Sequence, residues 1–205
     1  MSHRIVTMET AHVDGAVAAH ASAFPDRPNT AMGRPWLRYL YNYYLSSEGA
    51  ICLTALADDG TVLGAVLGGE PGVGQGFRKS AMRKFLPRLL FKSVFNPVMR
   101  ARAIRPIRER LSGANREDAP PKTPGRAGNL LSIGLIPQAR GTGAGGDLML
   151  EFQRRGRQQG FDYLYLYVAV DNARAVAFYE KHGWRRIHAN KRMARYERPI
   201  EAEEK

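Results

Sequence analysis

The sequence predicts one α/β domain with a mixed, mostly antiparallel central sheet flanked by helices. Three observations lead to this prediction: short apolar, β-branched segments alternate with segments of helical periodicity, two such strands flank a tight-turn sequence, and a glycine-rich turn joins another strand to a helix. The 205 residues, 44% of them apolar, suffice for one core and stay below the roughly 250 residues at which cores usually divide. We therefore expect a single domain over residues 1–205.

The first elements are a strand and two helices. Arg4 to Met8 is a short apolar stretch typical of a strand, and apolar residues from Val13 to Phe24 recur every three or four positions, which predicts a helix ended by Pro25. A second helix should begin near Pro35. Its tyrosines are expected either in the core or along a ligand cleft: Tyr39, Tyr41, Tyr43 and Tyr44.

A β-hairpin should follow these helices. Ala50 to Ala57 and Thr61 to Gly68 are apolar and β-branched, and Asp58, Asp59 and Gly60 between them are typical of a tight turn. The two segments are therefore predicted to be antiparallel neighbours in the sheet.

A basic insertion, residues 77–128, separates the hairpin from the rest of the sheet. After a glycine-rich bend at Gly68 to Gly76, residues 78–110 hold eleven basic side chains and one acidic one. Apolar residues at helical spacing predict two or three short helices in the insertion, broken or kinked by prolines, which are Pro87, Pro97 and Pro106. The proline- and glycine-rich stretch from Ser112 to Gly128 predicts a flexible loop that serves as a lid or a tether.

The formal net charge of the whole chain is +12, and the insertion carries most of it. Such a basic segment is either a solvated helix face or a binding surface for an acidic ligand or an anionic membrane. Nucleic acid is disfavoured as a partner, because the sequence has no paired zinc-ligand spacing, aromatic ribonucleoprotein signature or leucine zipper. A second copy of the chain, forming a homodimer, is a further candidate partner.

The cysteine content and the amino terminus indicate a cytoplasmic protein. The one cysteine, Cys52, excludes an intrachain disulfide and a cysteine-rich zinc site, so no metal is expected. The first residues lack a secretory pattern, and no apolar run approaches the roughly 18 residues needed to cross a bilayer.

The chain becomes regular again beyond Asn129. The expected elements are a strand at Leu130 to Ile136, a glycine-rich turn, a helix to about Gln159, a strand at Tyr163 to Val170, a helix at Ala173 to Lys181 and a last strand from Trp184.

The glycine-rich turn at residues 138–146 has the sequence expected of a phosphate-binding site. Its glycines let the backbone approach a ligand, and the first amides of the following helix have no internal partner and carry a partial positive charge. A nucleoside-triphosphate P-loop is excluded, because Asp147 and Leu148 stand where that loop needs lysine and a hydroxyl residue.

A dinucleotide-binding turn is the second alternative. Its G-x-G-x-x-G fingerprint is present as Gly141, Gly143 and Gly146, and Asp171 resembles the acid that binds ribose in such proteins. Residues 137–140, however, make a wider arch before the first glycine than that fold has, and the preceding order of elements is unlike a doubly wound sheet. The fingerprint alone is therefore weak evidence.

The third alternative fits two motifs. Gln138-x-x-Gly141-x-Gly143, after an apolar strand ending in Ile136-Pro137, resembles the acetyl-CoA pyrophosphate arch of the GNAT superfamily of N-acetyltransferases. Asn172-x-x-Ala175-x-x-Phe178-Tyr179-x-x-x-Gly183-Trp184 resembles the last motifs of that family. The resemblance covers Leu130 to Ile187, and the earlier order of strand, two helices and hairpin is also similar, which implies a GNAT fold. The insertion departs from the minimal family pattern and puts the substrate in doubt.

The resemblance implies acetyl-CoA as the cofactor. The strand before the arch would pair with the pantetheine arm through its edge amides, with Gly134 permitting a bulge that opens a gap to the next strand. Asn172 would hydrogen-bond the same arm, and Tyr179, two helical turns further on, would protonate the departing thiolate. The residues expected to bind the cofactor are Ile133, Leu135, Ile136, Gln138, Arg140, Gly141, Thr142, Gly143, Ala144, Gly145, Asn172 and Tyr179.

The implied reaction is direct attack of a primary amine of a small molecule on the thioester. A base must accept the proton of the amine, and Glu70 is the candidate, with Asp171 behind it, because the strand at residues 129–136 has no carboxylate. The basic insertion suggests an acidic acceptor. It also looks like insertions of GNAT proteins associated with surface-polysaccharide synthesis, which indicates a nucleotide-linked amino sugar. The alternative is a non-catalytic GNAT-like module that binds an anionic membrane or another polyanion through the insertion.

Overall fold

The computed structural model describes residues 2–95 and 123–200, with the backbone alone for residues 86–95. Seven strands form one sheet in the order β1-β2-β3-β4-β5-β7-β6, and all neighbours are antiparallel except β4 and β5, which are parallel. The strands are β1 (His3–Thr7), β2 (Ala50–Ala57), β3 (Val62–Gly69), β4 (Ala127–Leu135), β5 (Tyr163–Ala169), β6 (Arg185–Ala189) and β7 (Met193–Pro199). The expected mixed, mostly antiparallel sheet is confirmed.

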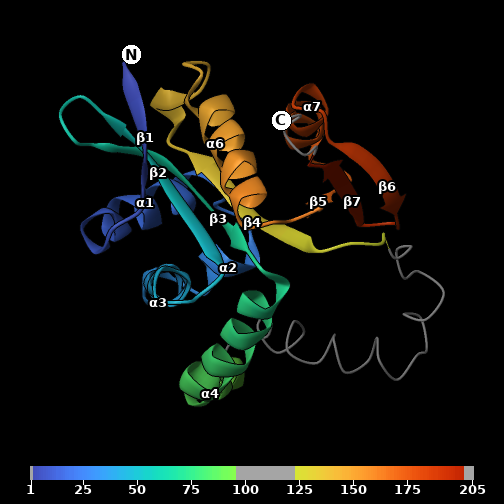
Figure 1. Cartoon of the computed structure of the whole chain (residues 1–205). Helices are drawn as coiled ribbons and strands as arrows, with labels where there is room; N and C mark the ends of the chain where they lie inside the picture. The colour runs from blue at the N-terminus through green and yellow to red at the C-terminus, as the bar shows by residue number, and fades with distance from the viewer. Residues whose placement is uncertain (1, 96–122, 201–205) are drawn as a thin grey trace.

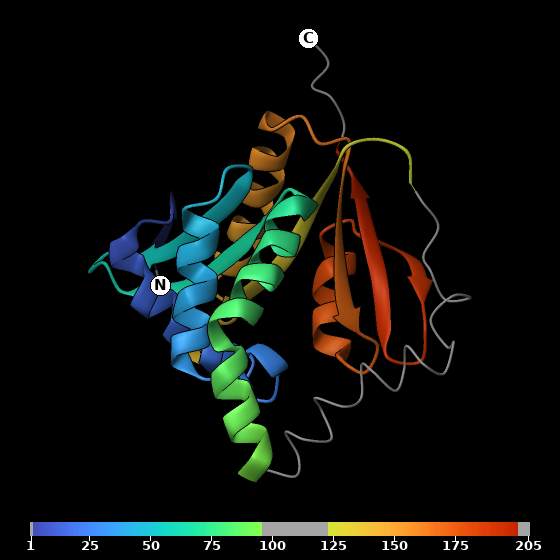
Figure 2. The same cartoon turned by 90° about the horizontal axis from the view of Figure 1, so that it is seen from below.

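Helices cover both faces of this sheet (Figures 1 and 2). We call the side covered by α1, α3 and α4 the α1 face and the side covered by α6 and α7 the α6 face. The helices are α1 (Val13–Ala23), α2 (Pro28–Ala31), α3 (Arg34–Leu45), α4 (Pro71–Phe95), α6 (Ala144–Gln158) and α7 (Ala173–Lys181), with short 3₁₀ turns η1 (Thr10–His12) and η2 (Pro137–Ala139).

Each face of the sheet has its own core. Alternate side chains of β3 point to opposite faces, so Val66 packs toward α6 and Leu67 toward α1 and α3. The largest fully buried side chains on the α6 face are Trp184, Tyr196 and Phe152. The helix with the four tyrosines packs on the α1 face, where Tyr41 is 2% exposed, so its tyrosines mainly build core.

The hairpin and most other elements lie within a few residues of their predicted positions. β2 and β3 are antiparallel, and Gly60 in their turn has a φ of 83°, a conformation that favours glycine. Two elements were not predicted: the single-turn helix α2 and the strand β7. β7 carries Arg195, Glu197 and Arg198, and the buried Ala194 and Tyr196 between them are too few to signal a strand.

The start of the insertion differs from the prediction. The expected glycine-rich bend is mostly helix, because α4 begins at Pro71, and α4 continues through Pro87 to Phe95 as one helix. A proline removes one backbone hydrogen bond of a helix and clashes with the preceding turn, and a long helix can absorb this as a kink. Pro97, Pro106 and most of the predicted loop at 112–128 lie outside the described residues. Within the described part of the chain, no helix is long and apolar enough to cross a membrane.

Candidate active site

The two parallel strands of the sheet form a fork. β4 and β5 pair only at Ala127 with Tyr163, at Gly128 with Leu164, and at Asn129 with Tyr165, although both strands continue beyond these pairs. The side chain of Asn129 closes the last pair by donating from Nδ2 to the Tyr165 carbonyl at 3.3 Å. Beyond this point the strands diverge and leave two unpaired backbone edges, as the separation of β4 from β5 in Figure 2 shows.

A bulge in β4 lies next to the point where the fork opens. Leu67 of β3 pairs with Ser132 and Gly68 pairs with Leu130, so Leu131 is the additional residue. The expectation of a bulge at Gly134 was wrong, because Gly134 pairs regularly with Ala65. Glycine is needed at position 134 for packing, since a Cβ there would lie 2.8 Å from the ring of Phe24 at the end of α1.

The amides of β4 divide between the two sides of the strand. The Ile136 amide donates to the Leu63 carbonyl at 2.9 Å, so it faces β3 and is not free for a ligand. This corrects the expectation that Ile136 contributes an edge amide. Because successive amides of a strand point to opposite sides, those of Ile133 and Leu135 point away from β3 and into the fork. Their binding to a cofactor stays a prediction.

The arch after β4 presents a row of free amides. In the first part of the arch the amides form hydrogen bonds to backbone carbonyls nearby. The Ala139 amide donates to the Ile136 carbonyl at 3.1 Å, and the Arg140 amide donates to the Pro137 carbonyl at 3.2 Å. The next six amides, of residues 141–146, donate to no acceptor in the described part of the chain. They include the first turn of α6, where an anion also meets the positive end of the helix dipole.

Glycine is required at two points of the arch. Gly141 and Gly143 have φ values of 82° and 94°, a region that other residues rarely adopt. Thr142 between them donates from its hydroxyl to the Ala139 carbonyl at 2.8 Å, which fixes the arch from within. Gly145 allows close packing, because a Cβ there would lie 3.1 Å from Leu135 and 3.5 Å from Phe178 of α7.

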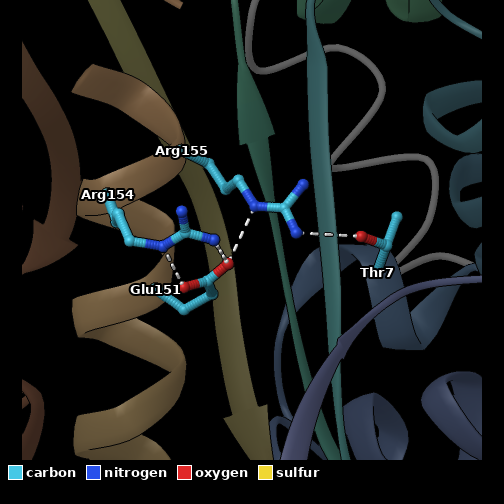
Figure 3. A network of polar contacts seen from close by, with 4 residues as sticks. All are labelled: Thr7, Glu151, Arg154 and Arg155. Atoms are coloured by element: carbon cyan, nitrogen blue, oxygen red, sulfur yellow. Dashed lines mark hydrogen bonds and ion pairs between the residues drawn. The ribbon is translucent and has the colours of Figure 1, made fainter. Parts of the chain in front are cut away.

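The helix that follows the arch is attached firmly to the sheet. Glu151 accepts hydrogen bonds from Arg154 and from Arg155, and Arg155 also donates to the Thr7 hydroxyl of β1 at 3.1 Å (Figure 3). In the first turn, Asp147 accepts a 2.7 Å hydrogen bond from the His3 ring. These contacts hold α6, and with it the amides at its amino-terminal end, in place against β1.

The second motif lies on α7. Asn172 is the N-cap of this helix, and its Oδ1 accepts a hydrogen bond from the Ala175 amide at 3.2 Å, which leaves the side-chain NH₂ group for another partner. At the other end Gly183 has a φ of 79°, the left-handed conformation expected after a helix. Asn172 therefore caps the start of α7, and Gly183 allows the chain to turn away after its end.

Tyr179 lies on α7 in the core of the α6 face. It is 9% exposed, and its ring lies 6.0 Å from that of Trp184 and 5.6 Å from that of Phe178. Burial raises the pKa of the Tyr179 phenol to about 12, so the hydroxyl holds its proton at neutral pH. No hydrogen bond joins this hydroxyl to another residue of the described chain.

Glu70 lies on the closed side of the fork. Its carboxylate forms an ion pair with Arg126, which directly precedes β4 and therefore lies on the side where β4 and β5 are hydrogen-bonded. The Arg126 guanidinium also donates to the Gln159 carbonyl and stacks on the Phe161 ring. This position gives no geometric support to Glu70 as the base. Asp171 is exposed in the turn after β5.

The α1 face of β5 and β7 carries functional groups that the sequence did not predict. Tyr165 pairs with Glu197 of β7, and Tyr167 pairs with Arg195, so these four side chains share one face. The signal that could have found them is the alternation in Tyr-Leu-Tyr-Leu-Tyr at residues 163–167. That alternation predicts one aromatic face and one aliphatic face of β5.

The arch of free amides beside the forked parallel strands fits a long phosphorylated cofactor. The sheet has one parallel pair, which excludes a doubly wound dinucleotide fold. A family model described as "Acetyltransferase (GNAT) family" matches residues 19–184. The chain therefore belongs to the GNAT family of acetyltransferases, as the arch and the α7 motif predicted. That family uses acetyl-CoA, and the free arch amides and open strand edges fit its pyrophosphate and its extended amide-bearing arm.

Solved structures share the fold at low sequence identity. The PaiA N-acetyltransferase of Thermoplasma acidophilum in complex with coenzyme A has a TM-score of 0.60 at 16% identity, covering 97% of this chain and 99% of that one. The ribosomal-protein-S18-alanine N-acetyltransferase of Escherichia coli has a TM-score of 0.59 at 12% identity, covering 98% and 96%. These likenesses show the GNAT fold and leave the acceptor open.

Curated relatives match only in part. A mycothiol acetyltransferase of Parafrankia sp. is 39% identical over 82 residues, which is 40% of this chain and 24% of the relative. A mycothiol acetyltransferase of Saccharomonospora viridis is 37% identical over 67 residues, 33% of this chain and 22% of the relative. The matched segments thus span about a quarter of the length of these relatives.

Proposed function

We propose that this protein is an acetyl-CoA-dependent N-acetyltransferase that moves an acetyl group directly to a primary amine of a small molecule. The observation that carries the proposal is the fork between β4 and β5 beside a row of six free amides at residues 141–146. Family membership supports the acetyl group as the one transferred. The acceptor we propose is acidic, with a nucleotide-linked amino sugar as the candidate suggested by the basic insertion.

The arch holds the pyrophosphate in this proposal. The amides of residues 141–146 donate to its oxygens, and the exposed side chains of Gln138 and Arg140 lie on the same arch, where Arg140 supplies a positive charge. Ile133 and Leu135 donate their free amides to the arm inside the fork, and the side-chain NH₂ of Asn172 is a third donor. When bound, acetyl-CoA supplies an acetyl group activated as a thioester.

Tyr179 is the proton donor in this proposal. Its phenol is protonated at neutral pH, and Tyr179 packs in the α6-face core that also holds Leu166 and Val168 of β5, the face from which it would approach the thiolate. A positioned general acid typically contributes about 10² to 10⁴ in rate. Tyr179→Phe should therefore lower kcat by about this factor, with little change in KM for acetyl-CoA or in melting temperature, because the ring keeps its packing. A kcat within threefold of the original would exclude the role.

The proton of the amine passes to water in this proposal. The carboxylates of Glu70 and Glu197 are both held in ion pairs, so neither is free to accept it. The value of kcat/KM should then rise with pH up to the pKa of the amine. It should not fall up to about pH 10, because the pKa of Tyr179 is about 12. Glu70→Gln should leave kcat/KM almost unchanged, whereas a hundredfold loss would restore Glu70 as the base.

Two measurements test the proposal as a whole. Acetyl-CoA at about 100 times its dissociation constant should stabilise the protein by roughly 2.7 kcal/mol in a melting scan, whereas NAD should not. Incubation with acetyl-CoA and a panel of amines should release free thiol. Stabilisation by acetyl-CoA without turnover on any amine would support the cofactor site but contradict the transferase activity.

Asn172 offers a matched pair of variants for the cofactor site. Asn172→Asp keeps an oxygen that can cap α7 but removes the NH₂ donor, so KM for acetyl-CoA should rise while stability stays close to that of the parent protein. Asn172→Ala removes both and should in addition lose about 1 kcal/mol of stability. An unchanged KM in both variants would show that Asn172 is a helix cap alone.

A further inference from the structure

Within the part of the chain that the structure describes, the α1 face of β5 is partly exposed at the mouth of the fork. The helices of this face pack on β2, β3 and β4, and Tyr167 of β5 remains 49% exposed. Tyr165 lies at the last hydrogen-bonded pair of the fork, and its ring meets that of Tyr167 edge-on at 5.9 Å. The proposed function uses neither tyrosine.

Arg195 and Glu197 of β7 form an ion pair that lies against the rings of Tyr165 and Tyr167. The Arg195 guanidinium lies 4.6 Å from the centre of the Tyr165 ring and 5.9 Å from that of Tyr167. It also forms a 2.5 Å ion pair with Glu197, whose side chain is 5% exposed and accepts a 2.6 Å hydrogen bond from the Thr123 hydroxyl. Because Glu197 neutralises it, Arg195 is a positioning residue for the two rings and supplies little net charge.

The charge at this face comes from α4. A Cβ at Gly74 would lie 3.1 Å from the Tyr44 hydroxyl, so this turn of α4 lies against Tyr44. Arg78 follows four residues later, on the same side of the helix, and is exposed. α4 follows directly from β3, whose Gly69 pairs with Asn129, the residue opposite Tyr165, and α4 also contacts β4, so its first turns lie on the α1 face near Tyr165. In agreement with this placement, the Arg78 charge opposes the burial that raises the pKa of the Tyr44 and Tyr165 phenols.

The following inference rests on the proposed function. We propose that the acceptor amine carries an anionic group, a carboxylate or a phosphate, and that Arg78 binds this group beside Tyr165 and Tyr167. No acid of the described chain forms an ion pair with Arg78, so its guanidinium is available to a ligand. A guanidinium binds carboxylate and phosphate through two parallel hydrogen bonds, which fixes the orientation as well as the charge of the ligand. The amine would then lie at the mouth of the fork, opposite Tyr179.

The test uses pairs of amines that differ in one anionic group. Tyramine is compared with tyrosine, and glucosamine with glucosamine 6-phosphate, by thiol release from acetyl-CoA. The parent protein should favour the anionic member of at least one pair by tenfold or more in kcat/KM. Arg78→Ala should lower kcat/KM for that member about 10- to 100-fold, mainly through KM, as expected when a hydrogen bond to a charged group is lost. It should leave the neutral member almost unchanged.

Two further variants make the test specific. Arg78→Lys keeps the positive charge but lacks the planar guanidinium group, so it should recover part of the preference for the anionic amine that Arg78→Ala loses. Lys79→Ala removes an equal charge from the next position of α4, which points about 100° away around the helix, and should leave the preference intact. An anionic preference that survives Arg78→Ala, or that Lys79→Ala removes equally, would overturn the assignment.

The outcomes separate this inference from the proposed function. Turnover of neutral amines with no preference for the anionic members would overturn the role of Arg78 alone. Absence of stabilisation by acetyl-CoA together with absence of thiol release would overturn the transferase proposal, and this inference with it. An unchanged melting shift with acetyl-CoA in Arg78→Ala would show that the variant is folded and keeps its cofactor site.

Discussion

Protonation of His20 should destabilise the protein as the pH falls below about 6.5. His20 lies in α1, is 5% exposed, and its ring packs edge-on against Phe24 at 5.0 Å and Tyr41 at 5.9 Å. Its Nδ1 forms one hydrogen bond, 3.2 Å long, to the Tyr41 hydroxyl. Burial lowers the pKa of His20 from 6.5 to about 4, because the core does not solvate an imidazolium.

The sign and the size of the effect follow from linkage. The folded pKa lies below the unfolded one, so the unfolded chain takes up the proton first and the native state loses stability as the pH falls from 6.5 toward 4. The full difference corresponds to about 3 kcal/mol, at about 1.4 kcal/mol per pH unit. At pH 5 about 2 kcal/mol of this is lost, equivalent to a fall of roughly 4 to 8 °C in melting temperature for a chain of this size.

Urea unfolding at pH 7.5 and at pH 5.0 measures this loss. The same two measurements on His20→Gln provide the control, because that variant has no group titrating at this position. Acidic side chains contribute to the pH dependence of both proteins, so the informative quantity is the difference between the two pH-dependent losses. The parent protein should lose about 2 kcal/mol more than the variant. Equal losses would refute the assignment of a buried neutral imidazole at position 20.

Three further predictions concern stability and reactivity. Gly68→Ala should lower the free energy of unfolding in urea by about 1 to 3 kcal/mol, because its Cβ would lie 2.2 Å from the Asn129 carbonyl oxygen. Gly72→Ala, which has open space around it, should not lower it, and equal effects of the two variants would contradict this reasoning. Glu197→Ala should cost about 1 to 3 kcal/mol by leaving the half-buried Arg195 without its counter-ion, and adding Arg195→Met should recover part of the loss. Burial raises the pKa of the Cys52 thiol to about 12, so a thiol reagent should label it only on unfolding, and rapid labelling of the native protein would show an accessible thiolate.

The parts of the site that depend on neighbouring residues in the chain could be predicted from the sequence. The arch needs glycine where φ is positive, and both Gly141 and Gly143 have positive φ. The cap at Asn172 and the glycine at position 183 follow from rules that act within one helical turn. Asn172 and Tyr179 share a helix face for the same reason.

The errors concern properties that depend on a partner strand or helix. The Ile136 amide is used by β3, and no property of the segment around Ile136 shows which side of it is paired. The role of Glu70 as the base stays a prediction, and its ion pair with Arg126 was not predicted because it joins residues 56 positions apart. β7 was missed because its charged side chains form their ion pair on a sheet face that only the folded chain creates.

The sequence by itself determined the glycine-rich arch, the helices α6 and α7 after it and the family to which the chain belongs, because backbone conformation and helix ends are set by residues a few positions apart. Only the tertiary structure decided where β4 and β5 separate, which amides remain free, and that the first turns of α4 lie on the α1 face near Tyr165 of β5. The physical reason is that hydrogen-bond pairing between strands and electrostatic proximity between helix and strand join residues far apart in the chain, and these act only once the sheet has formed.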